Sequence, residues 1–138
     1  MKNPIVVGAI AGVVVGIVSV IFSYIFYIVF RVLEPMGGFE IWDPSLIMLF
    51  ALANVSLGMI WGIIFSLIYS RLSNSIPGKG VMKGVYFGLL IWVVKDVAAG
   101  SYTVLIRTDV IWGIGLIVGG FFMWIVYGPL LWYLYKKE

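Results

Sequence analysis

Four long apolar runs dominate the chain, and short polar segments separate them. A helix needs about 20 apolar residues to cross the hydrocarbon core of a bilayer. Each run is at least this long, and only the third contains charged side chains. We therefore predict an all-α integral membrane protein whose transmembrane helices cover residues 5–30, 44–70, 81–106 and 110–135.

The outer end of the third run is the least defined of these boundaries. The composition at Gly100-Ser101 can end a helix. A helix that ended there would leave Lys95 and Asp96 near the outer interface, where lysine can extend its ammonium towards water. A helix that continues to Ile106 would instead place both charges deep in the span.

Composition changes the picture by excluding a water-soluble fold. Of 138 residues, 63% are hydrophobic and 11% are charged, whereas soluble domains are about 45–50% apolar and about 25% charged. A soluble domain of this size could not bury the excess. We expect one transmembrane domain over residues 1–138, with the lipid bilayer of the cell membrane as its surroundings. The net charge of +3 is too small and too scattered to predict nucleic-acid binding.

The distribution of basic residues predicts an orientation, because short cytoplasmic loops are enriched in lysine and arginine. Two basic residues, Arg31 and Arg107, fall on one predicted side together with four acidic residues. The opposite side has one acidic residue, Glu138, and six basic ones: Lys2, Arg71, Lys79, Lys83, Lys136 and Lys137. We therefore predict that both termini and the middle loop are cytoplasmic.

The two halves of the chain resemble each other. A shift of 76 residues superimposes Gly8 on Gly84 and Arg31 on Arg107, and a shift of 66 superimposes Asp43 on Asp109. These matches predict two helical-hairpin repeats, residues 1–71 and 77–138, which run parallel in the membrane, as the repeats of some transporters do. The alternative is that glycine-rich apolar helices resemble one another whatever their origin.

Small residues recur on one stripe of every predicted span. In lipid there is no hydrophobic drive between helices, so small residues that allow close approach mark helix contacts. The stripes predict a glycine-rich bundle, formed within one chain or between subunits, with packing positions at Gly8, Gly12, Gly16, Gly58, Gly62, Gly84, Gly88 and Gly120.

Polar residues of three spans share one predicted depth. Counted from the outer ends at about 1.5 Å per residue, this depth is roughly 16–18 Å, near the middle of the bilayer. A charge there costs at least about 2.5–3.5 kcal/mol and needs a partner. Adjacent residues of a straight helix point about 100° apart, so we do not expect the lysine and the aspartate to satisfy each other. The candidate site is Ser19, Asn54, Lys95 and Asp96, with Gly120 leaving space for them.

A second polar feature leads outward from this site. Gly100, Thr103 and Arg107 follow Asp96 at helical spacing and would form a stripe to the outer surface. Three interpretations remain open: a site for an ion or solute, a structural pair that joins helices or subunits, and charges at the outer interface.

Motifs of enzymes are missing from the sequence. With no Cys and no His, it lacks the thiols and imidazoles of nucleophilic catalysis and of common zinc or haem sites. Asp96 is the single acidic residue inside a predicted span, and a Ser19–Lys95 or Ser23–Lys95 dyad is a remote alternative. We expect no catalytic residues, no metal and no cofactor, and rank a lipid-modifying enzyme third.

The hypothesis with most support is a channel- or transporter-like unit for an ion or small solute, acting as a homo-oligomer. Its basis is the parallel repeat together with an ionisable layer at mid-depth. The alternative is an accessory or structural subunit of a larger membrane complex, whose glycine faces dock other helices and which transports nothing.

Overall fold

The computed structural model describes residues 3–30, 44–107 and 110–136. Within these segments the structure is helical apart from the end residues 3 and 136 and a turn at residues 73–80, and it contains no strand. Four of its helical stretches have the length and apolar composition needed to cross a membrane, which confirms the predicted class. The elements are α1 (Pro4–Phe30), α2 (Pro44–Leu72), α3 (Val81–Ile91), the π-helical segment η1 (Trp92–Val97), α4 (Ala98–Arg107) and α5 (Val110–Tyr135).

The third span is continuous, because α3, η1 and α4 follow one another without a break. It reaches Arg107, so the proposed end at Gly100-Ser101 is wrong. Apolar residues flank that dipeptide on both sides, and a helix that stopped there would leave its last carbonyls without partners in lipid.

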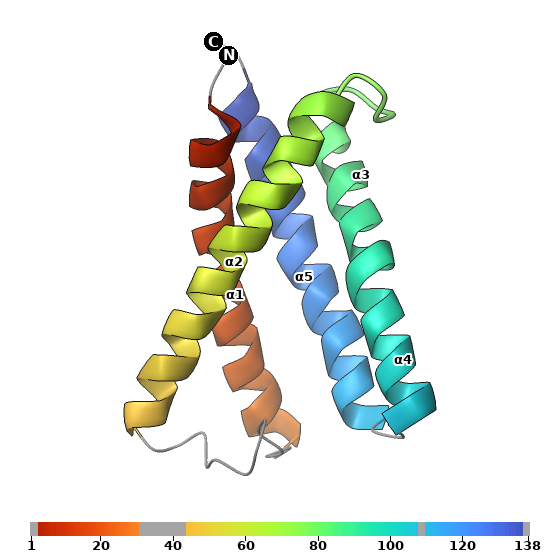
Figure 1. Ribbon diagram of the computed structural model, residues 1–138. Helices are drawn as coiled ribbons and strands as arrows, with labels where there is room; N and C mark the ends of the chain where they lie inside the picture. Colours follow the sequence, from red (N-terminus) through yellow and green to blue (C-terminus); the bar gives the residue numbers. More distant parts are fainter. Residues whose placement is uncertain (1–2, 31–43, 108–109, 137–138) are drawn as a thin grey trace.

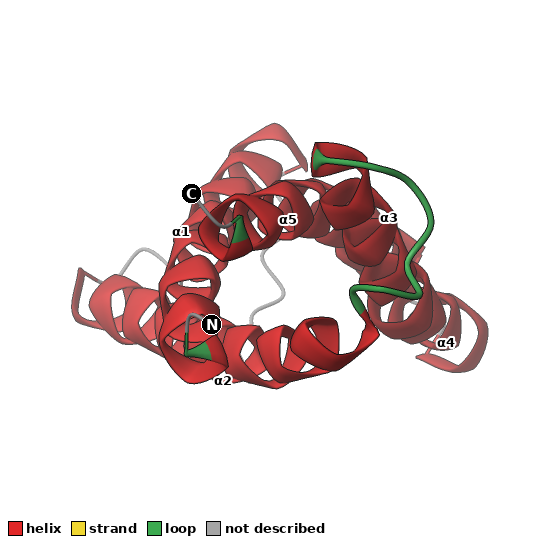
Figure 2. Cartoon of the chain, turned by 90° about the horizontal axis from the view of Figure 1, so that it is seen from above, coloured by secondary structure: helices red, strands yellow, loops and turns green. Residues whose placement is uncertain are grey.

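The helices are arranged as two packed pairs that share one further contact. α1 packs along α2, α3 and α4 pack along α5, and α5 also packs against α1 (Figures 1 and 2). The two termini lie at the same end of the bundle as the turn between α2 and α3 (Figure 1). Four of the basic residues used to predict orientation also belong to this end: Arg71, Lys79, Lys83 and Lys136.

Glycines allow the backbones of α1 and α2 to touch. A Cβ atom placed on Gly8 would lie 2.6 Å from the carbonyl oxygen of Gly62, and one on Gly58 would lie 2.6 Å from that of Gly12. Gly16 approaches the α2 backbone equally closely, at 2.6 Å. No other residue fits at such distances, which is the general reason for small residues at helix contacts in membranes.

The backbones of α3 and α5 meet in the same way. A Cβ atom on Gly84 would overlap the carbonyl oxygen of Gly128, and one on Gly88 would lie 3.0 Å from the carbonyl carbon of Trp124. Both crossings lie in the half of the bundle that contains the termini.

Aromatic side chains fill the space between the two pairs in this same half. Tyr127 is fully buried and donates a hydrogen bond to the carbonyl oxygen of Gly62 at 2.7 Å. Tyr69 packs against Phe87 with ring centroids 5.0 Å apart. Through such side chains α2 reaches α3 and α5. Towards its N-terminal end α2 splays away from α4 (Figure 1), and Leu49 there is 63% exposed.

The π-helical segment η1 keeps the third span in register with α5. Gly88 and Gly100 are 12 residues apart, which in a straight α-helix turns them about 120° away from each other. Both nevertheless face α5, where a Cβ on Gly100 would lie 2.7 Å from the carbonyl oxygen of Gly113. The wider turn of η1 absorbs one extra residue and returns Gly100 to within about 20° of Gly88.

Candidate functional site

The central feature of the candidate site is an ion pair between two neighbouring residues of η1. The Lys95 Nζ atom lies 2.8 Å from Asp96 Oδ1. The expectation that these two residues would not pair is wrong, because the helix is not straight here and the wider π turn reduces the angle between adjacent side chains. The carboxylate is buried, with 5% of its side chain exposed, whereas 33% of the lysine side chain is exposed.

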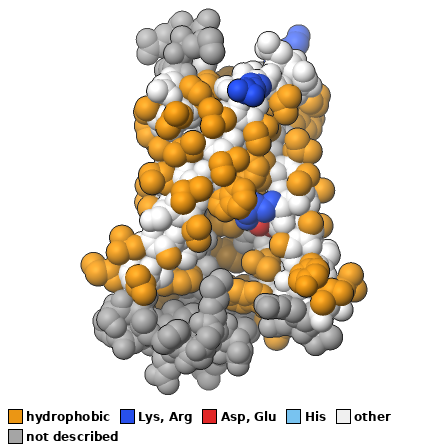
Figure 3. Space-filling view, viewed as in Figure 1, with side chains coloured by type: hydrophobic (Ala, Val, Ile, Leu, Met, Phe, Trp, Pro, Cys, Tyr) orange, Lys and Arg blue, Asp and Glu red, His pale blue; other side chains and the backbone are white. Residues whose placement is uncertain are grey.

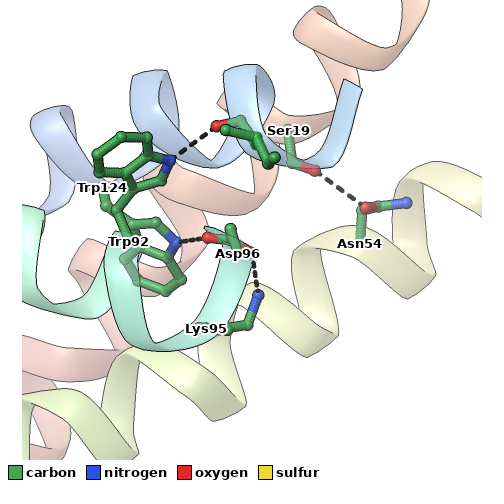
Figure 4. Close-up of polar contacts among 7 residues, drawn as sticks. Ser19, Asn54, Trp92, Lys95, Asp96 and Trp124 are labelled. Carbon is green, nitrogen blue, oxygen red and sulfur yellow. Dashed lines mark hydrogen bonds and ion pairs between the residues drawn. The ribbon is translucent and has the colours of Figure 1, made fainter. Parts of the chain in front are cut away.

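The α5 helix holds the carboxylate from the other side. The indole N–H of Trp124 donates a hydrogen bond to Asp96 Oδ2 (Figure 4). A Cβ atom at Gly120 would lie 2.5 Å from Asp96 Cγ. The aspartate therefore lies directly on a glycine, and any larger residue at position 120 would displace it.

Two indole rings flank the lysine ammonium. Lys95 Nζ lies 5.8 Å from the ring centroid of Trp61 and 5.4 Å from that of Trp124. These distances are within the range of cation–π attraction. Phe65 joins the two rings into one aromatic wall, since it stacks on Trp61 at 5.6 Å and meets Trp124 edge-on at 5.2 Å.

The first residue of η1 is also anchored on α5. The indole N–H of Trp92 donates a hydrogen bond of 2.7 Å to the carbonyl oxygen of Ile117 (Figure 4). A π-helical segment has i→i+5 hydrogen bonds and a wider turn than an α-helix, and such segments are frequent at functional sites. The anchor and the ion pair together fix η1 against α5.

The other two predicted site residues form a separate pair. Ser19 donates a hydrogen bond of 3.1 Å to Asn54 Oδ1, and Asn54 Nδ2 donates to the carbonyl oxygen of Phe50 at 2.9 Å. No hydrogen bond joins this pair to Lys95 or Asp96, although all four lie in one region of the bundle (Figure 4). The predicted layer thus consists of two polar groups, one on α1 and α2 and one on η1 and α5.

The outer stripe contributes little polar surface among the described side chains. Thr103 is buried, and its hydroxyl donates to the carbonyl oxygen of Ala99 at 2.9 Å within the same helix. Gly100 is packed against α5. The side chain of Arg107 lies outside the described residues.

A hollow in the surface adjoins the ion pair. Figure 3 shows blue and red side-chain atoms close together at mid-height of this face, beside a hollow and with apolar side chains around them. Lys95 is the more accessible member of the pair, because one-third of its side chain is exposed.

Sequence reasoning missed the three tryptophans of the site: Trp61, Trp92 and Trp124. Tryptophan is enriched at membrane interfaces, so the presence of tryptophan in a span does not by itself mark a site. These three are at least ten residues from both ends of their spans. An indole N–H at that depth needs an acceptor, so tryptophan in mid-span is a signal that could have found them.

The fold and site define a multi-pass α-helical membrane protein with an ion pair inside its bundle. Comparison with protein families, with curated proteins and with solved structures finds no match to the chain. Among the described residues no group of three or more acidic side chains is placed to hold a metal ion.

Proposed function

We propose that the protein is a transporter-like unit that binds an ion or small polar solute at Lys95 and Asp96. One observation carries this proposal: the aspartate is buried and held by Trp124, while its lysine partner is partly exposed. Ionisable residues inside membrane spans are costly and are typical of ion and substrate pathways.

The internal duplication belongs to this proposal and has structural support. In the first hairpin Gly8 meets Gly62 and Gly12 meets Gly58. The equivalent positions of the second hairpin meet in the same way: Gly84 meets Gly128, and Gly88 meets Trp124. Parallel repeats related by an axis along the membrane normal are found in transporters. We infer a homo-oligomer in the cell membrane with both termini in the cytoplasm.

The same alignment explains why the site lies in the second hairpin. Asn54 in the first hairpin corresponds to Gly120 in the second, at a shift of 66 residues. The asparagine fills its position and bonds to Ser19. The glycine leaves that position empty, and the carboxylate of Asp96 occupies it. Divergence at one position thus accounts for a charged site in one copy of the hairpin.

An accessory subunit is the second candidate, and the exposure of α2 favours it. Only 6% of the most apolar stretch of α2 is buried within the chain, against 22% to 33% in the other three spans. Lipid can cover such a surface, but so can a helix of another subunit. The native mass of the complex extracted in mild detergent distinguishes a homo-oligomer from a subunit of a larger assembly.

The transport proposal predicts ion-pair-dependent flux. Purified protein in liposomes should carry at least one of the tracers rubidium, chloride and methylammonium. The Lys95→Gln/Asp96→Asn double variant should reduce that flux at least about tenfold, because the attraction at one charged site exceeds 1.4 kcal/mol. Ser70→Ala is the matched control, because this serine hydroxyl donates a hydrogen bond to the carbonyl oxygen of Leu67 in its own helix, away from the ion pair. Absence of flux for all three tracers, together with recovery of a larger partner, would favour the accessory subunit.

A further inference from the structure

We propose that the ligand of this site is an organic ammonium cation, which displaces the Lys95 ammonium from a cage formed by Asp96, Trp61 and Trp124. This inference rests on the proposed function, since it names the substrate class of the same site. In the structure the cage holds a tethered occupant, the lysine of the protein itself.

The chemistry of the cage is selective for cations. A carboxylate and two indole faces surround one ammonium, at 2.8 Å, 5.8 Å and 5.4 Å from the nitrogen. Indole faces attract cations through their quadrupole, and aromatic cages are a recurring device for binding quaternary ammonium groups. An anion bound to Lys95 would instead meet the negative carboxylate and the negative faces of the rings. The site therefore favours a positive ligand even though it contains a lysine.

The walls of the cage are fixed, and the lysine is the part that can leave. Asp96 and Trp124 are 4% and 3% exposed, and a hydrogen bond joins them. Phe65 braces both indole rings. Lys95 has a flexible four-carbon stem and is one-third exposed, so its ammonium can move away from the carboxylate while the stem stays in apolar surroundings. Displacement of the Lys95 ammonium then requires movement of one side chain. The carboxylate of Asp96 stays in place and pairs with the ligand cation.

The surface beside the ion pair has a composition that suits the apolar substituents of such a cation. Trp61, on the wall beside Lys95, is 40% exposed, and Val94 is 67% exposed. Apolar side chains surround the pair in Figure 3. Alkyl groups on the ligand nitrogen would lie against this surface, whereas a bare alkali ion would gain nothing from it and would lose its hydration. The structure thus assigns an alkylammonium in preference to sodium or potassium.

Equilibrium binding of radiolabelled tetramethylammonium to the purified protein tests the proposal. Wild-type protein should bind it saturably, and tert-butanol, a neutral molecule of similar shape, should not compete. Lys95→Gln should tighten binding about tenfold or more, since a tethered competitor that fills the cage most of the time lowers the apparent affinity by that factor. Asp96→Asn, Trp61→Leu and the Lys95→Gln/Asp96→Asn double variant should each weaken binding about tenfold or more.

The direction of the Lys95→Gln effect decides the outcome. Weaker binding in this variant would overturn the proposal, because it would make the lysine a ligand contact in place of a competitor. Absence of tetramethylammonium binding in both the wild-type protein and Lys95→Gln, with helicity retained, would also overturn the proposal. Trp61→Leu leaves the ion pair in place, so it reports on the cage if the charge variants do not fold. Binding without flux would contradict transport alone, and flux without ammonium competition would contradict the cage alone.

Discussion

Lys95→Gln should destabilise the protein more than any other single change at the site. It leaves a buried carboxylate, whose side chain is 5% exposed, without its cation. Breaking a buried ion pair by removing one partner costs about 3–5 kcal/mol, and the partial exposure of Lys95 places this case near 3 kcal/mol. The free energy of unfolding in mixed detergent micelles, measured by titration with a denaturing detergent, checks this value.

Asp96→Asn is expected to cost less, about 1–2 kcal/mol. The asparagine can still accept the hydrogen bond from Trp124, and the freed ammonium of Lys95 can turn away from the site. The Lys95→Gln/Asp96→Asn double variant should recover much of the loss, because no unpaired charge remains buried. If Asp96→Asn lowered the free energy of unfolding as much as Lys95→Gln, the ammonium of Lys95 would be unable to turn away from the site. The difference in exposure between the two side chains would then not affect stability.

Binding and stability are coupled in this experiment. A cation that binds the folded protein stabilises it by an amount that grows with concentration. Tetramethylammonium should therefore raise the stability of Lys95→Gln more than that of the wild-type protein, in which the cage is already filled. The Lys95→Gln variant thus tests two claims in one measurement: that the empty cage lowers the stability of the protein, and that an alkylammonium cation fills the cage.

The spans could be predicted from sequence because lipid imposes a strict rule on the backbone. Every buried N–H and C=O group must be satisfied within the segment, so a run of about 20 apolar residues is a helix. The observed helices begin and end within two residues of the predicted ones. The same rule explains why Gly100 did not end the third helix.

The π-helical segment could not be predicted, because its cause lies in another helix. Nothing in the residues from Trp92 to Val97 marks a change from α-helical to π-helical geometry. The extra residue is accommodated because Gly88 and Gly100 must both face the backbone of α5. The straight-helix assumption therefore failed at this position, and with it the expectation that Lys95 and Asp96 would not pair.

The site was predictable in part. The cost of a charge in lipid drew attention to Lys95 and Asp96, and the structure places Gly120 directly under the carboxylate. The depth count also grouped Ser19 with Asn54, which do bond to each other. The indole partners come from α2 and α5, and no spacing within one span brings them together. Sequence reasoning thus found the charges and missed the cage around them.

The glycine crossings should be the positions where one added methyl group or more is least tolerated. Gly8→Val and Gly84→Val are expected to lower the free energy of unfolding by about 3 kcal/mol each, at the upper end of the cost of overpacking. In both cases the new Cβ atom meets a backbone carbonyl, at Gly62 or at Gly128, which cannot move without separating the two helices. Unfolding in mixed micelles and the yield of correctly assembled protein measure the effect.

Two control variants make this prediction specific. Ala99→Val adds two carbon atoms, one fewer than Gly→Val, at an exposed position of the third span and should change stability by less than about 0.5 kcal/mol. Gly119→Ala is expected to cost less than Gly8→Val or Gly84→Val. Its new Cβ atom would lie 2.7 Å from the ring edge of Phe22, and this side chain can rotate away, whereas a backbone carbonyl cannot. Equal losses at Gly8 and Gly84 would also support the duplication, because the two glycines correspond at a shift of 76 residues. A large loss of stability in one variant and none in the other would mean that the two glycine crossings contribute unequally to stability. The resemblance between the hairpins would then reflect composition and not duplication.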